Sequence, residues 1–383
     1  MKITYLLFNG HGVGGTVRTV FNQANSMVAR GHEVHVVTMW RTREETPFPL
    51  DERVHLLPLV DMRPSVRDTL TPPAIEDTSW HSLFPARLSE EPESRMRVNA
   101  LIEYLRGVKD GVLVCTRPTI ALIAERFSDP GLVRVVQEHA HLGVHKEVWR
   151  REMDSAYPSF DSIVTLTEAD QRAYREAFPG ARVDRIPNAL HSLDVPQSSL
   201  ASKVVVSAGR LVPDKRFDRL IKAFELVVQR HPDWTLRIYG EGPWLERLQR
   251  SVLKRHLYNH VFLVGPTRRL EERLAKGSIF ALSSRSEGFG MALLEALSCG
   301  LPAVSFDCPV GPREIIGHGE DGLLVPPGDI EGLAEGICRL IEDEELRRSF
   351  GAAARRKAAA YGPDAVAESW ERLYGELEGA KQR

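Results

Sequence analysis

The chain opens twice in the same way, and this repeated opening limits its fold more than any other feature of the sequence. Residues 2–8 are an apolar run that ends at a glycine-rich loop, an amphipathic segment follows, and a second apolar run occupies residues 32–40. The same order restarts at residue 203, where the loop carries Arg210 and Lys215. Strand, helix and strand in this order predict a parallel sheet with right-handed crossovers. Two such openings predict two α/β domains.

Both amphipathic segments have the spacing of a helix with one buried face, because their apolar residues recur at intervals of three and four positions. The apolar positions are Val17, Val20, Phe21, Ala24, Met27 and Val28 in the first segment, and Phe217, Leu220, Ile221, Phe224, Val227 and Val228 in the second. Further alternating strands and helices follow, including strands within residues 278–284 and 302–306 and helices at 291–298, 330–342 and 345–360. This alternation is typical of an α/β protein.

The boundary between the domains is expected at the polar, turn-rich stretch HSLDVPQSSLAS, residues 191–202, which has no periodicity. We therefore expect an N-terminal domain at 1–190, a linker at 191–202 and a C-terminal domain at 203–362. A last amphipathic helix is expected from 363 to 383.

Composition excludes several classes of function. The 383 residues carry a formal net charge of −2, which provides no overall field to attract nucleic acid. The 4 cysteines form no CxxC pair, so we interpret them as reduced core residues rather than disulfides or zinc ligands. No apolar run reaches the roughly 18 residues of a membrane-spanning helix. We expect a cytoplasmic protein, and peripheral association with the inner membrane face is left open.

The first loop, GHGVGG, places Gly10, Gly12 and Gly15 in a GxGxxG pattern after a strand. A dinucleotide enzyme would also need an acidic residue at the end of the second strand to bind the ribose. Here Glu33 stands at the beginning of that strand, and the strand ends at Trp40. What remains is a loop whose glycines and helix N-terminus suit an anion. A tight turn without a ligand is the alternative interpretation.

The second loop, GRLVPDK, places Arg210 and Lys215 between a strand and a helix N-terminus, an arrangement that suits a diphosphate. The strongest segment is SSRSEGFGMALLEALSCGLPAVSF, in which a strand is expected to end at Ser284. Glu287 then lies at the carboxyl end of a strand, where open α/β sheets bind their ligands. Glu295 lies within the following apolar helix, where its carboxylate can accept both hydroxyls of a ribose.

Glu287 and Glu295, with seven residues between them, resemble the EX7E motif of family-4 glycosyltransferases. Other segments agree with that family in order along nearly the whole chain: GGTVRT, IPNAL, SAGRLVPDK, YGEGP, FLVG and GPREIIGHGEDGLLVPPGD. The resemblance implies a GT-B fold, in which two Rossmann-like domains are joined and the last helix crosses back onto the N-terminal domain. It also implies retaining transfer of a sugar from a nucleotide-sugar, most often a UDP-sugar, with no metal and no other cofactor.

The resemblance assigns roles to individual positions. The catalytic residues would be His139, Arg210, Lys215 and Glu287. The donor would be bound by Gly14, Gly15, Arg210, Lys215, Val264, Gly265, Glu287, Gly288, Phe289, Gly290, Met291 and Glu295. Within this set Arg210 and Lys215 would hold the phosphates. Glu287 would contact the sugar and Glu295 the ribose. An amide at Gly15 would meet the diphosphate, and backbone around Val264 and Gly265 would meet the base.

The acceptor is a hydroxyl that the sequence does not identify. The form DCPVGPREII resembles family branches that decorate cell-surface polymers, and lipid-linked glycans and small natural products stay open as acceptors. The irregular stretch 61–93 is rich in Pro, Ser and charge, and loops of that length are functional or disordered. We interpret it as a partly mobile loop near the acceptor, with simple disorder as the alternative.

A metal site and other enzyme classes are the alternatives to this interpretation. His139, His141 and His145 are close in sequence, but neighbouring side chains after a strand point to opposite faces, so we expect no shared metal site. Asp154, Asp161 and Asp170 do not form an adjacent carboxylate pair. The alternatives are another GT-B enzyme, such as a nucleotide-sugar epimerase or a phosphorylase, and a non-catalytic relative that binds nucleotide-sugars.

Overall fold

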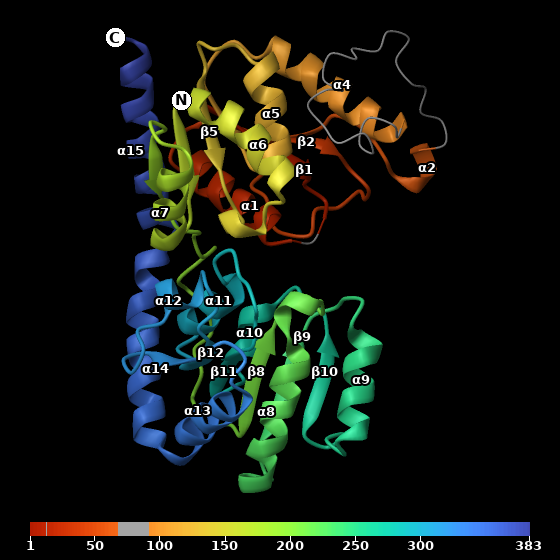
Figure 1. Cartoon of the computed structure of the whole chain (residues 1–383), viewed down its shortest axis with the longest axis vertical. Coiled ribbons are helices and arrows are strands. Elements are labelled where there is room, and N and C mark those ends of the chain that lie inside the picture. Colours follow the sequence, from red (N-terminus) through yellow and green to blue (C-terminus); the bar gives the residue numbers. More distant parts are fainter. Residues whose placement is uncertain (13, 68–91) are drawn as a thin grey trace. The chain divides into compact units, whose positions relative to one another are not determined.

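The computed structural model describes residues 1–12, 14–67 and 92–383. Contacts divide the chain into two compact units, the first made of residues 1–189 and 363–383 and the second of residues 190–362 (Figure 1). Each unit is built on its own all-parallel sheet. The α/β class of two Rossmann-like domains expected from the sequence is confirmed.

The first unit has a seven-stranded sheet in the order β3-β2-β1-β4-β5-β6-β7. Its strands are β1 (Lys2–Asn9), β2 (Glu33–Trp40), β3 (His55–Pro58), β4 (Val112–Cys115), β5 (Val133–Gln137), β6 (Ser162–Thr165) and β7 (Val183–Arg185). Its helices are α1 (Gly15–Ala29), α2 (Pro64–Arg67), α4 (Pro92–Gly107), α5 (Pro118–Phe127), α6 (Glu147–Ala156), α7 (Glu168–Ala177) and α15 (Pro363–Lys381). One face of the sheet packs on α4, α5, α6 and α7, and the other on α1 and α15.

The second unit has a six-stranded sheet in the order β10-β9-β8-β11-β12-β13. Its strands are β8 (Val204–Ala208), β9 (Thr235–Tyr239), β10 (Val261–Gly265), β11 (Ile279–Leu282), β12 (Ala303–Phe306) and β13 (Gly322–Val325). Its helices are α8 (Phe217–Arg230), α9 (Leu245–Lys254), α10 (Leu270–Leu274), α11 (Met291–Ser298), α12 (Pro312–Ile315), α13 (Ile330–Glu342) and α14 (Glu344–Ala358). The faces of α8, α9 and α13 share one core with the sheet, as the apolar spacing of these segments requires.

The last helix, α15, belongs to the first unit although residues 190–362 come before it in the chain. Trp370 and Tyr374 are buried in the same core as Tyr5 of β1. Glu371 forms an ion pair with Arg30 at 2.6 Å, and its carboxylate also lies 2.7 Å from Nε2 of His32. The helix is therefore held by an apolar face and by charges beside it, and it crosses back as the fold class implies.

Residues 191–202, expected as a linker, lie within the second unit. The backbone N–H of Ser198 donates to the carbonyl of Cys299 at 2.9 Å, and its hydroxyl donates to the carbonyl of Gly277 at 2.5 Å. The Gln197 amide donates to the carbonyl of Ser298 at 3.0 Å. Short polar side chains gave the segment a linker-like composition, but here they bond backbone groups of the unit on which the segment lies.

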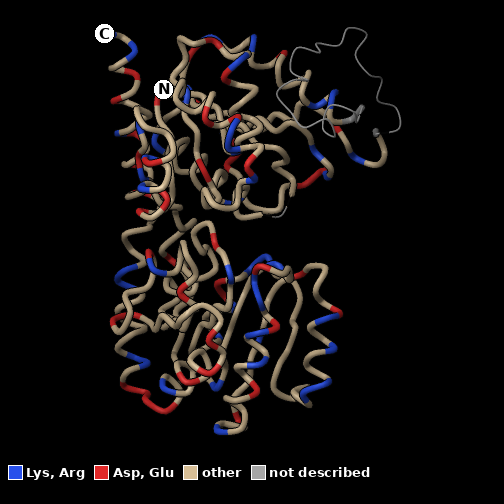
Figure 2. Tube along the Cα trace, viewed as in Figure 1, with Lys and Arg blue, Asp and Glu red and all other residues tan. Residues whose placement is uncertain are grey.

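The irregular stretch 61–93 falls largely on residues 68–91, so its interpretation as a mobile loop lies outside the described residues. Acidic and basic residues are interspersed along the helices of each unit, in keeping with the net charge of −2 (Figure 2). Within the described part of the chain, no helix is both long and apolar enough to cross a membrane.

Candidate functional site

The second sheet changes direction between β8 and β11, which lie side by side although β9 and β10 intervene in the chain. Ligands of open α/β sheets bind at the carboxyl ends of the strands at such a switch point. The loop after β8 carries Arg210 and Lys215, and the loop after β11 carries Glu287. The topology therefore brings these two loops together.

Lys215 and Glu287 form a close ion pair at this point. The ammonium Nζ lies 2.5 Å from Oε1 and 2.6 Å from Oε2 of the carboxylate. The Ser284 hydroxyl donates to Oε1 at 2.6 Å, and the Ser283 hydroxyl donates to the carbonyl of Lys215 at 2.9 Å. Only 21% of the Lys215 side chain and 8% of the Glu287 side chain are exposed, so the two charges are held in a poorly hydrated place.

A second pair of residues fastens the same two loops. The backbone N–H of Arg285 donates to the carbonyl of Asp214 at 2.7 Å, and the Arg285 guanidinium donates to the Asp214 carboxylate at 2.6 Å. Asp214 and Lys215 belong to a short 3-10 turn, Pro213–Lys215, just before α8. Strand β11 ends at Leu282 rather than at Ser284 as expected, because Ser283 and Ser284 leave the sheet to make these loop contacts.

The segment from Gly288 to Met291 forms a turn that leads into α11. Gly290 caps this helix with a φ of +106°, a conformation that favours glycine. The first turn of α11 contains no acidic side chain, so no fixed negative charge within that turn opposes an anion at its amides. The turn is braced by Gly311, at which a Cβ would stand 2.5 Å from the carbonyl oxygen of Phe289. The loop thus has the form of an anion site.

The remaining candidates of the second unit lie at the same end of its sheet. Arg210 is exposed on the loop after β8. Glu295 lies on α11 with 2% of its surface exposed. Val264, 50% exposed, and Gly265, with a φ of +93°, end the edge strand β10. The structure thus places Lys215 and Glu287 in contact and assigns Arg210, Glu295 and the end of β10 to the surrounding loops and helix.

Sequence reasoning missed Cys308, which is buried in the vicinity of Glu287. Burial, followed by the negative charge of Glu287, raises the pKa of the Cys308 thiol to about 12. Cys308 is therefore a neutral thiol within electrostatic reach of the Glu287 carboxylate. Its only signal in the sequence was its place after a strand, in FDCPVG.

In the first glycine loop, packing requires a glycine at one position and does not require it at two others. A Cβ at Gly10 would approach Cγ2 of Thr38 to 2.8 Å, so packing against β2 requires a glycine there. Within the described part of the chain, a Cβ at Gly14 or at Gly15 would meet nothing within 4 Å. Gly14 caps α1 with a φ of −174°, which any residue can adopt. The fold itself therefore does not require a glycine at either of these two positions.

His139 follows β5 at the carboxyl end of the first sheet. Its Nε2 is buried and has no hydrogen-bond partner among the residues that the structure describes. Burial, followed by the charge of Arg117, lowers the pKa of His139 to about 3. The imidazole is therefore neutral near pH 7, and its ring can bond a hydroxyl without bringing a charge.

The neighbouring histidines have protein partners of their own. His141 Nδ1 lies 2.7 Å from the Asp170 carboxylate, and His145 Nε2 lies 3.6 Å from the Glu138 carboxylate. Glu138 also accepts a hydrogen bond from the hydroxyl of Tyr157. Over residues 1–12, 14–67 and 92–383, no three His, Cys, Asp or Glu side chains are grouped as metal ligands. His139, His141 and His145 therefore belong to different local networks.

Comparison with known proteins shows the family and the fold of the chain. Residues 13–191 match the family model described as Glycosyltransferase Family 4, and residues 194–357 match the model of Glycosyl transferases group 1. Staphylococcus aureus TarM, whose G117R mutant was solved with Fondaparinux, α-GlcNAc-glycerol and UDP, has the same fold. The TM-score is 0.79 at 17% identity, with 98% of this chain and 100% of that chain covered.

Two relatives are more similar in sequence. An exopolysaccharide phosphotransferase of Streptomyces coelicolor is 37% identical over 98% of this chain, which spans 41% of that protein's length. The amylovoran biosynthesis glycosyltransferase AmsD of Erwinia amylovora is 30% identical over 73% of this chain and 83% of its own. The chain therefore belongs to the GT-B glycosyltransferases. It is an enzyme of that class.

Proposed function

We propose that the protein transfers a sugar from a nucleotide-sugar to a hydroxyl acceptor, and that this donor is a UDP-sugar. The transfer proceeds with retention of configuration and without a metal ion. The observation that carries the proposal is the contact between Lys215 and Glu287 at the switch point of the second sheet. An ammonium has three donors, so Lys215 can bond Glu287 and a phosphate oxygen at the same time. Lys215 would then connect Glu287, which would bond the sugar, with the diphosphate, which is the leaving group.

The donor roles of the second unit follow from this placement. Lys215, Arg210 and the N-terminus of α11, from Gly288 to Met291, would stabilise the diphosphate. Positive groups held in place where negative charge develops provide a large part of enzymatic rate enhancement. Glu287 would bond hydroxyls of the transferred sugar, and Glu295 the hydroxyls of the ribose.

Other assignments rest on the resemblance alone. Backbone at Val264 and Gly265 would contact the base. Gly14 and Gly15 would give amides to the donor, and His139 would orient the sugar. The described part of the protein has no contact that would exclude a side chain at Gly14 or Gly15. This supports a role for these glycines in letting a ligand approach the backbone closely.

Retention requires either a covalent intermediate on the opposite face of the sugar or attack on the same face as departure. We assign the second route. The bond from the anomeric carbon to the phosphate oxygen breaks, and the acceptor oxygen bonds to that carbon from the same side. The departing phosphate oxygen takes the acceptor proton, so no protein nucleophile is needed. Strong stabilisation of the diphosphate makes this route possible, which is the task given to Arg210 and Lys215.

The acceptor is proposed to be a cell-surface polymer, with a lipid-linked glycan or a small natural product as alternatives. The names of the relatives support this, since one belongs to amylovoran biosynthesis and another is an exopolysaccharide phosphotransferase. UDP as the nucleotide is supported by the TarM complex. A cytoplasmic protein that associates with the inner membrane face would meet such an acceptor during its synthesis.

The test begins with a panel of nucleotides in calorimetry, followed by release of UDP from UDP-sugars and by NMR of the product. We expect UDP to bind, a UDP-sugar to be consumed, and an α-linked donor to give an α-linked product. A β-linked product would contradict the front-face route. A protein that binds UDP but converts no nucleotide-sugar would be a non-catalytic relative, and reversible change of the free donor would identify an epimerase.

A further inference from the structure

Residues 288–291, which we call the donor turn, depend on packing for their shape. Gly290 is the N-cap of α11, and no side-chain hydrogen bond caps this helix in the described part of the chain. Gly288 and Gly290 flank Phe289, and glycine allows more backbone conformations than any other residue. Only 3% of the surface of Phe289 is exposed. The turn is therefore held by what packs on the buried Phe289 ring.

Tyr361 supplies an aromatic ring that packs on Phe289. The two ring centres are 5.8 Å apart and the ring planes meet at 62°, so the edge of one ring faces the other. This is one of the favoured arrangements of aromatic pairs. Tyr361 is partly buried and ends the 3-10 turn Ala359–Tyr361, which follows α14. The donor turn is thus in contact with the last residues of the second unit.

The Tyr361 hydroxyl bonds a second element that braces the donor turn. It donates to the carbonyl of Glu314, on α12, at 3.1 Å. Helix α12 follows Gly311, at which a Cβ would stand 2.5 Å from the carbonyl oxygen of Phe289 and 3.0 Å from Cβ of Glu287. Tyr361 therefore contacts the turn with its ring, and its hydroxyl bonds the helix whose N-terminus supports the turn.

The backbone that carries Tyr361 is itself fixed. The Tyr361 carbonyl accepts a hydrogen bond from the backbone N–H of Leu190 at 2.8 Å. A Cβ at Gly362 would approach Cδ1 of Leu193 to 2.8 Å, so these two residues are closely packed. Leu190 and Gly362 are the first and last residues of the second unit. The chain therefore enters and leaves this unit at adjoining points, and Tyr361 is anchored there.

We propose that Tyr361 is a positioning residue for the transfer of the sugar, and that it holds the donor turn so that the amides at the N-terminus of α11 face the diphosphate. The inference rests on the proposed function, and Tyr361 acts through Phe289 rather than on the substrate. Negative charge grows on the diphosphate as its bond to the sugar breaks, so the alignment of these amides matters most in the transition state. Loss of the Tyr361 ring should therefore lower kcat more than it weakens the binding of UDP.

The experiment measures the release of UDP from UDP-glucose and UDP-N-acetylglucosamine by the full chain, and the binding of UDP by calorimetry. Tyr361→Leu should lower kcat about 10-fold or more and change the Kd for UDP by less than about threefold, because small misplacements of catalytic groups cost rate. Tyr361→Phe keeps the ring and should retain more of the rate. Phe289→Leu should also lower kcat, and the double variant should be no slower than the slower single variant. Tyr258→Leu, at an exposed tyrosine of the same unit, is the matched control and should change nothing.

Hydrogen exchange gives a readout that does not depend on turnover. The N–H groups of Leu293 and Leu294 donate to the carbonyl of Gly290 at 3.0 and 3.1 Å, so their exchange reports whether the donor turn is held. We expect Tyr361→Leu to speed this exchange and to leave the exchange of α8 unchanged.

Two failures can be told apart on these samples. If the unchanged protein neither binds UDP nor releases it from either donor, the proposed function is wrong, and the exchange at Leu293 and Leu294 alone decides the inference. Exchange equal to that of the unchanged protein would overturn the inference. It would also be overturned by kcat losses of the two single variants that multiply in the double variant, or by a lower Tm of Tyr361→Leu with an unchanged kcat.

Discussion

Lys215 and Glu287 are 72 residues apart in the chain, yet the ammonium contacts both oxygens of the carboxylate, at 2.5 and 2.6 Å. The pair unites the loops that follow two neighbouring strands, and a third residue, Ser284, bonds one of the same oxygens. Both charges are largely removed from water, so the attraction between them must offset the free-energy cost of their lost hydration. The ion pair between Lys215 and Glu287 therefore contributes both to the stability of these loops and to the proposed chemistry.

Lys215→Met should lower both stability and activity. It leaves the Glu287 carboxylate buried without its counter-charge, and breaking such a pair costs on the order of 3 kcal/mol. Adding Glu287→Gln should restore most of the stability but none of the turnover. Chemical denaturation of both single variants and the double variant gives the coupling free energy. Lys222→Met, at an exposed lysine of α8, is the control. Independent, additive effects of the two substitutions would contradict the coupling.

Glu295→Gln should weaken the binding of UDP by about 10-fold or more, the size expected for a charged hydrogen bond. The ribose does not change during the reaction, so the ground and transition states lose the same contact. KM for the donor should therefore rise while kcat stays nearly constant. Calorimetry with UDP and initial rates measure the two effects. Glu331→Gln, at an exposed glutamate of α13, should alter neither. Unchanged UDP affinity would remove Glu295 from the donor site.

Gly15→Ala and Gly311→Ala should behave in opposite ways. At Gly15 a Cβ has nothing within 4 Å, so we expect an unchanged or higher Tm together with a lower kcat/KM, because only an approaching ligand would meet the methyl group. At Gly311 the φ of +102° and the 2.5 Å approach to the Phe289 carbonyl predict a loss of about 1–3 kcal/mol in stability. Thermal unfolding and donor kinetics separate the two. A fully active Gly15→Ala enzyme would leave the first glycine loop without a role in binding.

His139 should make the protein less stable as the pH falls. Its pKa drops from 6.5 to about 3 on folding, so between these values the unfolded chain takes up a proton that the folded chain does not. The free energy of unfolding should therefore decrease with falling pH through this window, by at most about 1.4 kcal/mol per pH unit. His139→Gln should reduce this slope, and His256→Asn, at an exposed histidine, should not. Parallel slopes for His139→Gln and the unchanged protein would contradict a neutral buried imidazole.

Turnover should survive exhaustive chelation. Arg210, Lys215 and the N-terminus of α11 already supply positive potential for the diphosphate, which is the task of a divalent cation in other transferases. Initial rates with excess EDTA and with added Mg²⁺ or Mn²⁺ should agree within about twofold. Activity that disappears on chelation and returns with metal would overturn this part of the proposal.

The sequence predicted the elements well where local signals coincide. Helices α11, Met291–Ser298, and α13, Ile330–Glu342, have the expected bounds, because an apolar stripe begins just after a capping residue in each. The sequence also located both loops of the second unit. It could not give the contact between Lys215 and Glu287, because that contact depends on which strands become neighbours. The order of strands is a property of the whole sheet and leaves no local pattern.

The stacking of Trp40 on Phe8 and the contact of the Arg117 guanidinium with the Phe8 ring escaped sequence reasoning for the same reason. Phe8 and Trp40 read as ordinary apolar residues at strand ends, and Arg117 as a basic residue before a helix. Only the adjacency of β1, β2 and β4 brings them together. The single available hint was Arg117 itself, a cation placed between an apolar strand and the proline that begins α5. His139 was proposed from resemblance. Only the structure shows that its Nε2 is buried and has no hydrogen-bond partner in the described part of the chain.

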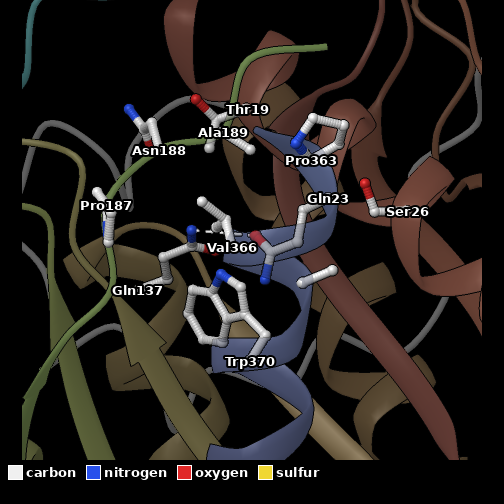
Figure 3. A pocket seen from close by; sticks show the side chains of 11 residues that line it. Thr19, Gln23, Ser26, Gln137, Pro187, Asn188, Ala189, Pro363, Val366 and Trp370 are labelled. Atoms are coloured by element: carbon white, nitrogen blue, oxygen red, sulfur yellow. Dashed lines mark hydrogen bonds between the residues drawn. The ribbon is translucent and has the colours of Figure 1, made fainter. Parts of the chain in front are cut away.

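The return of α15 to the first unit has a consequence for synthesis on the ribosome. Trp370, seen beside Gln23 and Gln137 in Figure 3, covers a face of the first sheet whose strands were translated long before it. The part of that face that α15 covers stays open until residues 363–381 emerge, whereas residues 190–362 form a continuous segment that can fold as soon as it is complete. The second unit can therefore finish folding before the first. A nascent chain stalled near residue 362 would display the uncovered apolar sheet and would be a substrate for chaperones.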